Sequence, residues 1–444
     1  MELPSRVLVV GLGESGVAAA HLAASLGAEV WATDRRPEDE LAAALRSLPA
    51  GTRTFLGGHP EEALEEAGLV VTSPGVPPEL PLLAAARRRR IPVWPEIELA
   101  WRCRPEAPLV AVTGSNGKST VTVLVAEMLR EAGIAAREGG NLGPPASRLV
   151  LEGGFSAWVL EVSSFQAEAL VELRPRVAVV TNLSQDHLER HPDMDRYAAA
   201  KFRLLARQTP EDAAVLNADD TRVAAAPTAA RRLRFSLEGK ADGWLDGATL
   251  RIGSTMVVEA SRIRLAGRHN LANALAATLA AGELGVAPEV AAAVLERFQG
   301  LPHRHATVAE RGGVRWVDDS KATNVGATVA ALSGYPGRSV HLILGGLAKG
   351  QSFAPLRPAV ARAAVRVYLI GRDAERIAEA LEGAAELERC GTLERAVARA
   401  RELARPGETV LLAPACASFD QFPGYAERGA RFAELARREV APCR

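Results

Sequence analysis

The sequence predicts an α/β protein of three domains, each built around a mainly parallel sheet. At 444 residues the chain is too long for one ordinary hydrophobic core, so two to three domains of roughly 100–200 residues each are expected. Short apolar runs rich in β-branched residues alternate with Ala-, Leu- and Arg-rich helical stretches, which is the pattern of parallel α/β domains. Three stretches of this kind follow one another along the chain.

The first domain is expected over residues 1–97 and is predicted to be Rossmann-like. Its strands are predicted at residues 6–10, 28–33 and 68–72. The four arginines at residues 87–90 end an Ala-rich stretch, which favours a solvated helix C-terminus over a basic patch. The Pro-containing segment from Ile91 to Pro108 interrupts the pattern and predicts a linker.

The central domain is expected over residues 98–302 and is predicted to be a parallel sheet of the P-loop ATPase type. Its strands are predicted at residues 109–112, 157–162 and 177–181, and small antiparallel strands are expected within residues 221–262. The third domain, residues 303–444, is predicted to be a Rossmann-like α/β domain. Its strands are predicted near residues 314–318, 339–344, 365–370 and 409–413.

Composition excludes several classes of protein. Lys+Arg and Asp+Glu both total 53, so the neutral balance indicates neither a nucleic-acid partner nor a membrane surface. The four cysteines are scattered, which fits a reducing compartment and does not fit a zinc site. No apolar run reaches the roughly 18 residues that span a bilayer, and the N-terminal segment does not resemble a secretory signal. We therefore expect a cytoplasmic protein.

The first glycine-rich loop, Gly11-Leu-Gly-Glu-Ser-Gly16, follows a predicted strand and opens a helix. Asp34 comes about 20 residues later, as in the dinucleotide-binding fingerprint. Taken alone, this pattern predicts an NAD(P)-dependent oxidoreductase. Such a loop holds a diphosphate at a helix N-terminus whatever nucleotide carries it, so a UDP-linked substrate fits equally well. Gly75, in Ser-Pro-Gly, closes another strand at the same edge.

A phosphate loop is predicted at residues 113–120, Thr-Gly-Ser-Asn-Gly-Lys-Ser-Thr, between an apolar strand and a helical run. The glycines let backbone N–H groups close around phosphate oxygens. Lys118 is expected at the β- and γ-phosphates, and Ser119 or Thr120 at a magnesium ion. Val112 stands where the longer form of the motif has its first glycine, so this loop is a shortened version.

Two polar segments follow strands near the phosphate loop. Glu161 ends a predicted strand and is placed to ligate magnesium. His187 lies in the loop after the next strand, where a neutral imidazole suits a metal or a substrate. Asp186 could equally be a turn residue. Lys201, considered by itself, is typical of a surface lysine on a helix.

Three polar loops follow predicted strands of the third domain, at residues 318–324, 345–349 and 414–422. Open α/β sheets bind ligands at this edge. The loops combine cations, hydroxyls and turn residues, a mixture that suits a small anionic amino acid.

Together these segments closely resemble the Mur ligase family of peptidoglycan synthesis along the whole chain. The motifs that carry the resemblance are TGSNGKST, EVSSFQ, NLSQDHLERH, GRHNLANALAA, LPHR, DDSKATN and PACASFDQF. The resemblance implies a UDP-substrate domain, a central ATPase domain and a C-terminal domain for the incoming amino acid. It implies an ATP-dependent ligase that activates a carboxylate as an acyl phosphate and adds D-glutamate to UDP-N-acetylmuramoyl-L-alanine.

The resemblance also implies roles on the ATP side of the site. ATP is expected to contact Gly114, Asn116, Gly117, Lys118, Ser119, Thr120, Asn270, Asn273, Arg304 and Asp319. Two magnesium ions are implied, one at Ser119 and Glu161 and another at His187. Lys201 falls where the family has a carbamylated lysine whose new carboxylate positions metal, which replaces the surface interpretation. Lys118, Lys201, His187 and Lys321 are the implied catalytic residues.

The remaining implied contacts are with the other substrates. The muramoyl substrate is expected to meet Ser15, Asp34, Arg36, Gly75, Asn141, Ser163 and Gln166, and D-glutamate to meet Thr323, Lys349, Ser418 and Phe419. Glu14 and Arg35 depart from the family pattern near the uracil, and Phe419 and Tyr425 depart from it near the glutamate. The implied partners are therefore small molecules, and a monomer is expected.

Three alternatives remain open at this point. A sibling Mur ligase, or a folate polyglutamylating enzyme, would use the same chemistry with another amine. An NAD-dependent oxidoreductase rests on the first glycine-rich loop and leaves the phosphate-loop domain unexplained. A non-enzymatic nucleotide switch would have no use for the acidic and histidine loops.

Overall fold

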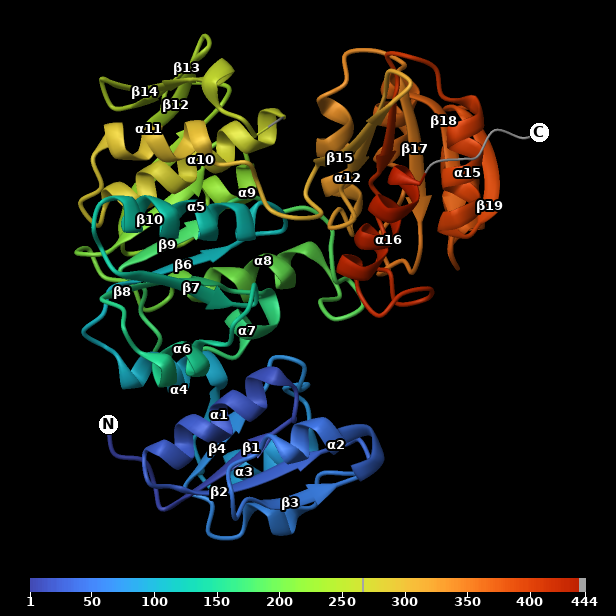
Figure 1. Cartoon of the computed structure of the whole chain (residues 1–444). Coiled ribbons are helices and arrows are strands. Elements are labelled where there is room, and N and C mark those ends of the chain that lie inside the picture. Colours follow the sequence, from blue (N-terminus) through green and yellow to red (C-terminus); the bar gives the residue numbers. More distant parts are fainter. Residues whose placement is uncertain (266, 439–444) are drawn as a thin grey trace.

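A computed structural model of the chain describes residues 1–265 and 267–438 as three α/β units. Each unit has one sheet, and the three follow one another in sequence and in space (Figure 1). The N-terminal unit lies at one end of the central unit, and the C-terminal unit lies beside it. The predicted α/β class with three domains is confirmed.

The N-terminal sheet has the order β3-β2-β1-β4-β5, with all strands parallel. Its strands are β1 (Arg6–Val10), β2 (Glu29–Asp34), β3 (Arg53–Leu56), β4 (Leu69–Thr72) and β5 (Val93–Pro95). Its helices are α1 (Glu14–Ser25), α2 (Glu38–Arg46), the short η1 (Glu61–Leu64) and α3 (Pro81–Arg88). The chain leaves β1 in one direction and β4 in the other, so the loops after these two strands face one crevice. Helix α3 ends in the arginine run, and residues 87–90 are exposed as expected.

The prediction of a linker from Ile91 to Pro108 is wrong in part. The start of this segment forms β5, and its middle forms helix α4 (Glu96–Cys103). Ile97, Leu99 and Ala100 of α4 are fully buried, so an apolar helix face holds this segment against the central unit. The prolines that suggested a linker lie at the ends of these elements, where they are tolerated.

The central sheet has nine strands in the order β14-β13-β12-β11-β10-β9-β6-β8-β7. They are β6 (Leu109–Thr113), β7 (Ala136–Gly140), β8 (Ala157–Glu161), β9 (Val177–Val180), β10 (Ala213–Asn217), β11 (Arg231–Ser236), β12 (Gly243–Asp246), β13 (Thr249–Ile252) and β14 (Thr255–Glu259). Strands β6 to β12 pair in parallel, and β13 pairs antiparallel with β12 and β14. The antiparallel strands expected in residues 221–262 are therefore present.

Helices cover both faces of the central sheet (Figure 1). They are α5 (Lys118–Glu131), α6 (Ala146–Glu152), α7 (Ser164–Glu168), α8 (Met194–Phe202), η2 (Arg203–Leu205), α9 (Thr221–Ala224), η3 (Ala260–Arg262), α10 (Arg268–Gly282) and α11 (Pro288–Arg297). Strand β6 lies between β8 and β9, so the loops after these three strands meet at one edge.

The C-terminal sheet has the order β15-β16-β20-β17-β18-β19, parallel except for the antiparallel pair β15–β16. Its strands are β15 (Ala306–Arg311), β16 (Val314–Asp318), β17 (Val340–Gly345), β18 (Ala364–Ile370), β19 (Glu386–Gly391) and β20 (Thr409–Leu412). Its helices are α12 (Val325–Ser333), α13 (Leu356–Ala363), α14 (Ala374–Leu381), α15 (Leu393–Leu403) and α16 (Tyr425–Arg437). The loops after β16, β17 and β20 lie at one edge.

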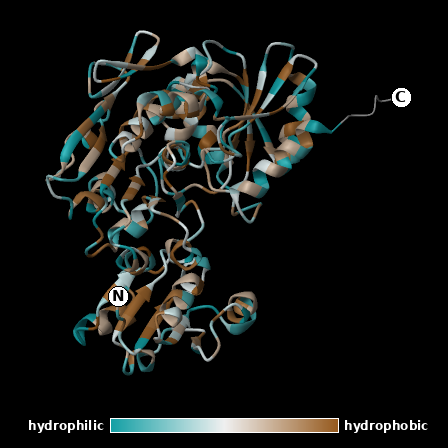
Figure 2. Ribbon diagram, turned by 60° about the vertical axis from the view of Figure 1, so that its left-hand side comes forward, coloured by the Kyte–Doolittle hydropathy of each residue, from teal (hydrophilic) through white to brown (hydrophobic). Residues whose placement is uncertain are grey.

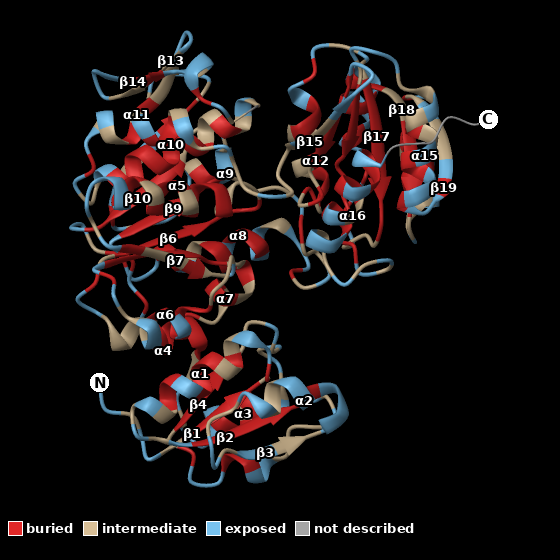
Figure 3. Cartoon of the chain, viewed as in Figure 1, coloured by how far each residue is buried: buried red, intermediate tan, exposed pale blue. Residues whose placement is uncertain are grey.

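The hydrophobic cores show how the units are joined. Apolar strands occupy the interior, and the exposed helix faces are polar (Figures 2 and 3). One buried cluster runs from β1 and α1 through α4 to β6 and β8, so the N-terminal and central cores are continuous. The buried clusters of the C-terminal unit contain only its own residues. Its link to the central unit is therefore mainly polar, and that link surrounds the candidate site. None of the described helices is both long and apolar enough to cross a membrane.

Candidate active site

The phosphate loop lies between β6 and α5, as predicted. Gly114 has a φ of +139°, and a Cβ there would lie 2.0 Å from Thr181 Oγ1. Gly117 has a φ of +84°, and its Cβ would lie 2.3 Å from Asn273 Oδ1. Both positions combine a backbone conformation that favours glycine with a close neighbour, so a side chain at either would distort the loop.

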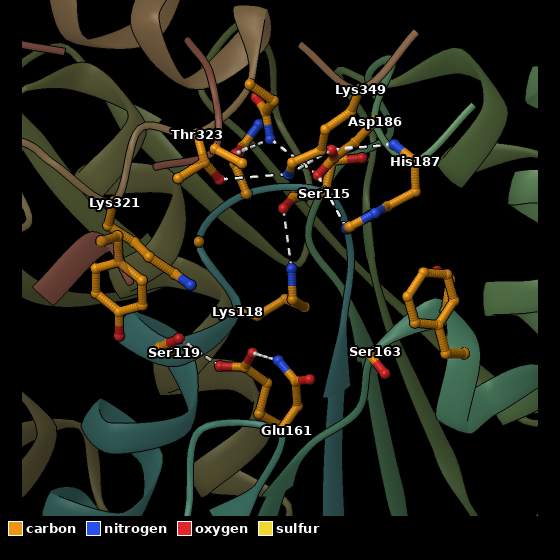
Figure 4. A pocket seen from close by; sticks show the side chains of 18 of the residues that line it. Ser115, Lys118, Ser119, Glu161, Ser163, Asp186, His187, Lys321, Thr323 and Lys349 are labelled. Atoms are coloured by element: carbon orange, nitrogen blue, oxygen red, sulfur yellow. Dashed lines mark hydrogen bonds and ion pairs between the residues drawn. The ribbon is translucent and has the colours of Figure 1, made fainter. Parts of the chain in front are cut away.

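Two lysines share one acceptor in this loop (Figure 4 shows Lys118). The Nζ of Lys118 donates to the carbonyls of Gly114 at 3.0 Å and Ser115 at 2.9 Å. The Nζ of Lys201, on α8, donates to the Gly114 carbonyl at 2.8 Å. Lys201 is buried, so the surface interpretation of its isolated motif is wrong. Burial and the neighbouring Lys118 lower the pKa of Lys201 well below its usual value.

Glu161 lies across the loop from these lysines, at the end of β8. Ser119 Oγ donates directly to Glu161 Oε2, and Asn141 Nδ2 donates to Oε1 at 2.7 Å. Arg304, from the start of the C-terminal unit, donates to Ser119 Oγ at 2.5 Å. Burial opposes ionisation of Glu161, but Lys118 and the hydrogen bonds outweigh it and hold its pKa below the usual value.

The donors in this cluster suit magnesium bound together with a nucleotide. No group of three or more His, Cys, Asp or Glu residues in residues 1–265 and 267–438 could hold a metal by itself. Magnesium in phosphate-transfer sites takes few protein ligands and completes its shell with phosphate oxygens and water. The hydroxyl of Ser119 beside the ionised Glu161 provides such a pair.

Asp186 and His187 follow β9 and face the C-terminal unit. Lys349 Nζ lies 3.0 Å from Asp186 Oδ1, and Asn324 Nδ2 donates to Asp186 Oδ2 at 3.2 Å. His187 lies edge-on to Phe165, with 5.0 Å between ring centroids, and burial lowers its pKa. Asp186 is therefore more than a turn residue, because it joins two units.

One cavity of about 300 Å³ contains most of these groups, and we call it the phosphate-loop cavity. The C-terminal unit contributes its other end, where Lys321 Nζ lies 4.0 Å from the centre of the Tyr425 ring. Burial and the nearby Arg304 lower the pKa of Lys321 to about 8. The predicted residues that line this cavity are Asn116, Gly117, Lys118, Ser119, Asn141, Glu161, Ser163, His187, Lys201, Arg304, Lys321, Thr323, Lys349, Ser418 and Phe419.

A second cavity of about 360 Å³, the α10 cavity, lies on the other side of the phosphate loop. The predicted residues that line it are Asn116, Gly117, Thr120, Asn270, Asn273, Arg304, Asp319 and Lys321. Leucines and alanines supply an apolar wall, as a purine base requires. His269 and His305 also line it, and the sequence interpretation missed both because a lone histidine carries little signal.

A third cavity of about 680 Å³, the N-terminal cavity, is lined by Ser15, Asp34, Arg36 and Gly75 among others. The Asp34 carboxylate accepts several hydrogen bonds within the protein. Leu12 N donates to it at 2.7 Å, and the Arg36 side chain donates through Nη2 at 2.8 Å and Nε at 3.0 Å. Burial opposes ionisation, but the bonds from Arg36 prevail and lower the pKa of Asp34 to about 2. Asp34 therefore orients Arg36. His59, which the sequence interpretation missed, lines the same cavity.

Two predicted contact residues lie outside these three cavities. The Gly114 carbonyl accepts both lysines, so Gly114 shapes the loop from behind. Gln166 is buried at the start of α7, where its Oε1 accepts from Ser163 N at 2.9 Å in a capping box. The side-chain oxygen of Gln166 thus orients Ser163, which does line the phosphate-loop cavity. Cys443, one of the four scattered cysteines, lies outside the described residues.

A phosphate loop that opens toward a buried carboxylate on one side and toward the cationic side chains of the C-terminal unit on the other is typical of a nucleotide-dependent enzyme. The chain belongs to the Mur ligase family. Family models match residues 5–94 (Mur ligase MurD-like, N-terminal domain), 112–281 (Mur ligase middle domain) and 303–416 (Mur ligase, glutamate ligase domain).

Curated relatives and solved structures resemble the whole chain. A UDP-N-acetylmuramoylalanine--D-glutamate ligase from Anaeromyxobacter dehalogenans is 47% identical, with 97% of each chain covered. The enzyme of the same name from Myxococcus xanthus is 43% identical over the same shares. A UDP-N-acetylmuramate-alanine ligase structure from Thermotoga maritima has a TM-score of 0.62 at 21% identity, covering 97% of this chain and 98% of its own. A pseudomurein peptide ligase type C from Methanothermus fervidus has a TM-score of 0.63 at 20% identity, covering 97% and 99%.

Proposed function

We propose that this enzyme adds D-glutamate to UDP-N-acetylmuramoyl-L-alanine at the expense of ATP, in peptidoglycan precursor synthesis. The observation that carries the proposal is the phosphate-loop cavity, in which Lys118 at one end faces Thr323, Lys349 and Ser418 at the other. One cavity therefore offers a place for a phosphoryl group and a place for a carboxylate-bearing amine. Relatives named for this reaction, 47% and 43% identical over 97% of the chain, support the choice of substrates.

ATP is proposed to occupy the α10 cavity, with its base against the apolar wall and its phosphates at the loop. Asn270 and Asn273 would face the nucleotide from α10, and Arg304 and Asp319 from the C-terminal unit. Magnesium would be held by Ser119 and Glu161, with a second ion at His187 and Lys201. When bound, magnesium neutralises phosphate charge and polarises the phosphoryl oxygens.

The chemistry proceeds in two balanced steps. A carboxylate oxygen of the alanyl substrate bonds to the γ-phosphorus as the bond to the β–γ bridging oxygen breaks, which releases ADP. The amine nitrogen then bonds to the acyl carbon, phosphate leaves with one carboxylate oxygen, and the amine gives up a proton. Lys118 and the loop amides stabilise the phosphoryl charge in the first step.

Lys201 is proposed to be carbamylated. A carbamate forms when a neutral amine adds to carbon dioxide and releases a proton, so the reaction requires an amine that is uncharged near neutral pH. Burial favours the neutral form of Lys201, which is held beside Gly114 and above the Tyr197 ring at 4.7 Å. The new carboxylate would give the metal position a further oxygen ligand.

The positions of the other substrates are proposed from the residues that line the cavities. The UDP group is proposed to bind in the N-terminal cavity at Ser15, Arg36 and Gly75, with Asp34 behind them. The muramoyl-alanine part would extend past Asn141 and Ser163, and Gln166 would act by orienting Ser163. D-glutamate would bind Thr323, Lys349, Ser418 and Phe419.

A monomer is proposed, because one chain lines all three cavities. The proposed compartment is the cytoplasm, where ATP and a UDP-linked precursor are available. The competing function is a sibling ligase with another amine, which the same phosphate loop would serve equally well.

The test is magnesium-dependent phosphate release from ATP in the presence of UDP-N-acetylmuramoyl-L-alanine and one amine at a time. D-glutamate, L-glutamate, L-lysine and L-alanine are compared. Release with D-glutamate alone supports the proposal. Release with a different amine retains the ligase chemistry and overturns the substrate assignment, and no release with any amine overturns both.

A further inference from the structure

A buried arginine lies behind the amino-acid end of the phosphate-loop cavity. Arg428, on α16, is 1% exposed. Its Nε donates to Ser320 Oγ at 3.0 Å, and its Nη2 donates to the carbonyls of Ser320 at 2.9 Å and Cys416 at 3.1 Å. None of the described carboxylates forms an ion pair with it, so a buried guanidinium is held by neutral acceptors alone.

The two residues that Arg428 binds sit directly beside the ligand-facing side chains. Ser320 precedes Lys321, and Cys416 comes two residues before Ser418. Both carbonyls lie beyond the end of the β16–β20 ladder, whose last pair is Asp318 and Leu412. Neither carbonyl therefore has a strand partner, and Arg428 supplies the donor that each needs.

The loop after β17, which contains Gly346, packs against the same guanidinium. A Cβ on Gly346 would lie 3.4 Å from Arg428 Nη1 and 2.4 Å from the Ala417 carbonyl. Leu347 and Ala417 exchange backbone hydrogen bonds at 2.9 and 3.0 Å. Arg428 thus contacts the backs of the loops after β16, β17 and β20, whose fronts present Lys321, Lys349 and Ser418.

We propose that Arg428 is a positioning residue for the incoming amino acid, and that it sets the spacing of the three ligand loops. Asp318 and Asp420 act on its charge without forming an ion pair with it, so the charge also adds to the positive field behind a site for a dicarboxylate. The inference rests on the proposed function, because the amino acid concerned is D-glutamate. A purely structural arginine would instead affect the binding of all substrates together, or only the stability of the fold.

The test compares Arg428→Met and Arg428→Lys with Arg431→Met, a matched change three residues along the same helix. Arg431 is a partly exposed arginine that pairs with Glu394 and Glu434. KM is measured separately for D-glutamate, ATP and the UDP substrate. Arg428→Met is expected to raise KM for D-glutamate at least tenfold while the other two constants change less than about twofold. Arg428→Lys should give a smaller rise because it keeps the charge but not the three-point geometry, and Arg431→Met should have no effect.

If Arg428→Met does not fold, Ser320→Ala carries the test, since it removes the Nε acceptor and leaves the arginine in place. It is expected to raise KM for D-glutamate at least threefold. Folded variants with an unchanged KM for D-glutamate, or with all three constants raised equally, would overturn the inference. Failure of the proposed function is recognised separately, because the unmodified enzyme would then release no phosphate with D-glutamate.

Discussion

Lys349 of the C-terminal unit and Asp186 of the central unit form an ion pair with 3.0 Å between Nζ and Oδ1. Asn324 reinforces it, with its Nδ2 donating to Asp186 at 3.2 Å and to Asn116 Oδ1 at 3.1 Å. The apolar clusters of the C-terminal unit do not extend into the central unit, so these polar contacts hold the described arrangement together. A carboxylate bound as proposed would share Lys349 with Asp186, which would couple amino-acid binding to the contact between the units.

Lys349→Met is predicted to raise KM for D-glutamate at least tenfold, which is about 1.4 kcal/mol of lost binding. The carboxylate loses its cation, and the buried Asp186 keeps Asn324 but loses its ion-pair partner. KM for ATP should change less than about twofold. Steady-state kinetics measures both constants, with Lys240→Met, at an exposed lysine of the central unit, as the control. An unchanged KM for D-glutamate would remove Lys349 from the amino-acid site.

Lys201→Ala is predicted to lower kcat at least a hundredfold, because the variant cannot form the carbamate. A short carboxylate such as acetate should restore part of the activity, since it can occupy the space of the missing carboxylate. Mass spectrometry of the unmodified enzyme in ¹³C-bicarbonate, with methylation to trap the carbamate, tests the modification directly. Full activity of Lys201→Ala, or loss that no carboxylate relieves together with no trapped label, would contradict it.

Titration of Lys321 is predicted to cause a decrease of kcat/KM at alkaline pH. Its pKa is lowered to about 8, so it is cationic below that pH and loses its charge above it. If the cation binds a substrate anion, kcat/KM for the unmodified enzyme falls above about pH 8. The arginine of Lys321→Arg stays charged over this range. The kcat/KM of the unmodified enzyme, divided by the kcat/KM of Lys321→Arg, should therefore fall with rising pH. Kinetics of both proteins from pH 6.5 to 10 decides this, and a constant ratio would count against a cationic role.

Glu96→Gln is predicted to stabilise the protein at alkaline pH only. Burial raises the pKa of Glu96 to about 7, and its Oε2 has no hydrogen-bond partner in the described chain. The folded state keeps a proton that the unfolded chain releases above about pH 4.5, so stability falls as pH rises from there to about 7. The full effect is on the order of 3 kcal/mol.

Glutamine carries no such proton, and its amide oxygen can still accept from Ser147 N, as Glu96 Oε1 does. Urea unfolding at pH 5 and pH 8 should therefore show little difference between the two proteins at pH 5 and a more stable variant at pH 8. Equal differences at both pH values would show that Glu96 is ionised in the folded state.

Much of the fold was predictable, because the ten strands expected at apolar runs are all present. Edge strands escaped prediction for a physical reason. β7 reads Ala-Arg-Glu-Gly-Gly and β19 reads Glu-Leu-Glu-Arg-Cys-Gly, and each pairs with only one neighbour. Strands of this kind need little apolar surface, so they resemble loops in the sequence. β10, though buried and central, was missed because Ala-Ala-Val-Leu-Asn also suits a helix.

The candidate site was predictable where a local motif carries the chemistry, as in the phosphate loop and Glu161. It was not predictable where the role depends on a contact between distant segments. Asp186 acquires a partner only when the loop after β17 approaches it, 163 residues away in sequence. Asp34 lines the N-terminal cavity, and its hydrogen bonds from Leu12 and Arg36 could not be read from the sequence. Arg428 lies in a helical segment without any motif, and only its burial reveals it.

The most direct test of the proposed ligase uses UDP-N-acetylmuramoyl-L-alanine with ¹⁸O in both oxygens of the alanyl carboxylate. Unlabelled ATP and D-glutamate are added, and the released phosphate is analysed by mass spectrometry. Attack of the carboxylate on the γ-phosphorus predicts one ¹⁸O atom per released phosphate and one ¹⁸O atom left in the amide product. Phosphate release without D-glutamate should be slower than release in its presence. Phosphate without label would mean that water, and not the substrate carboxylate, attacks ATP, and would contradict the account.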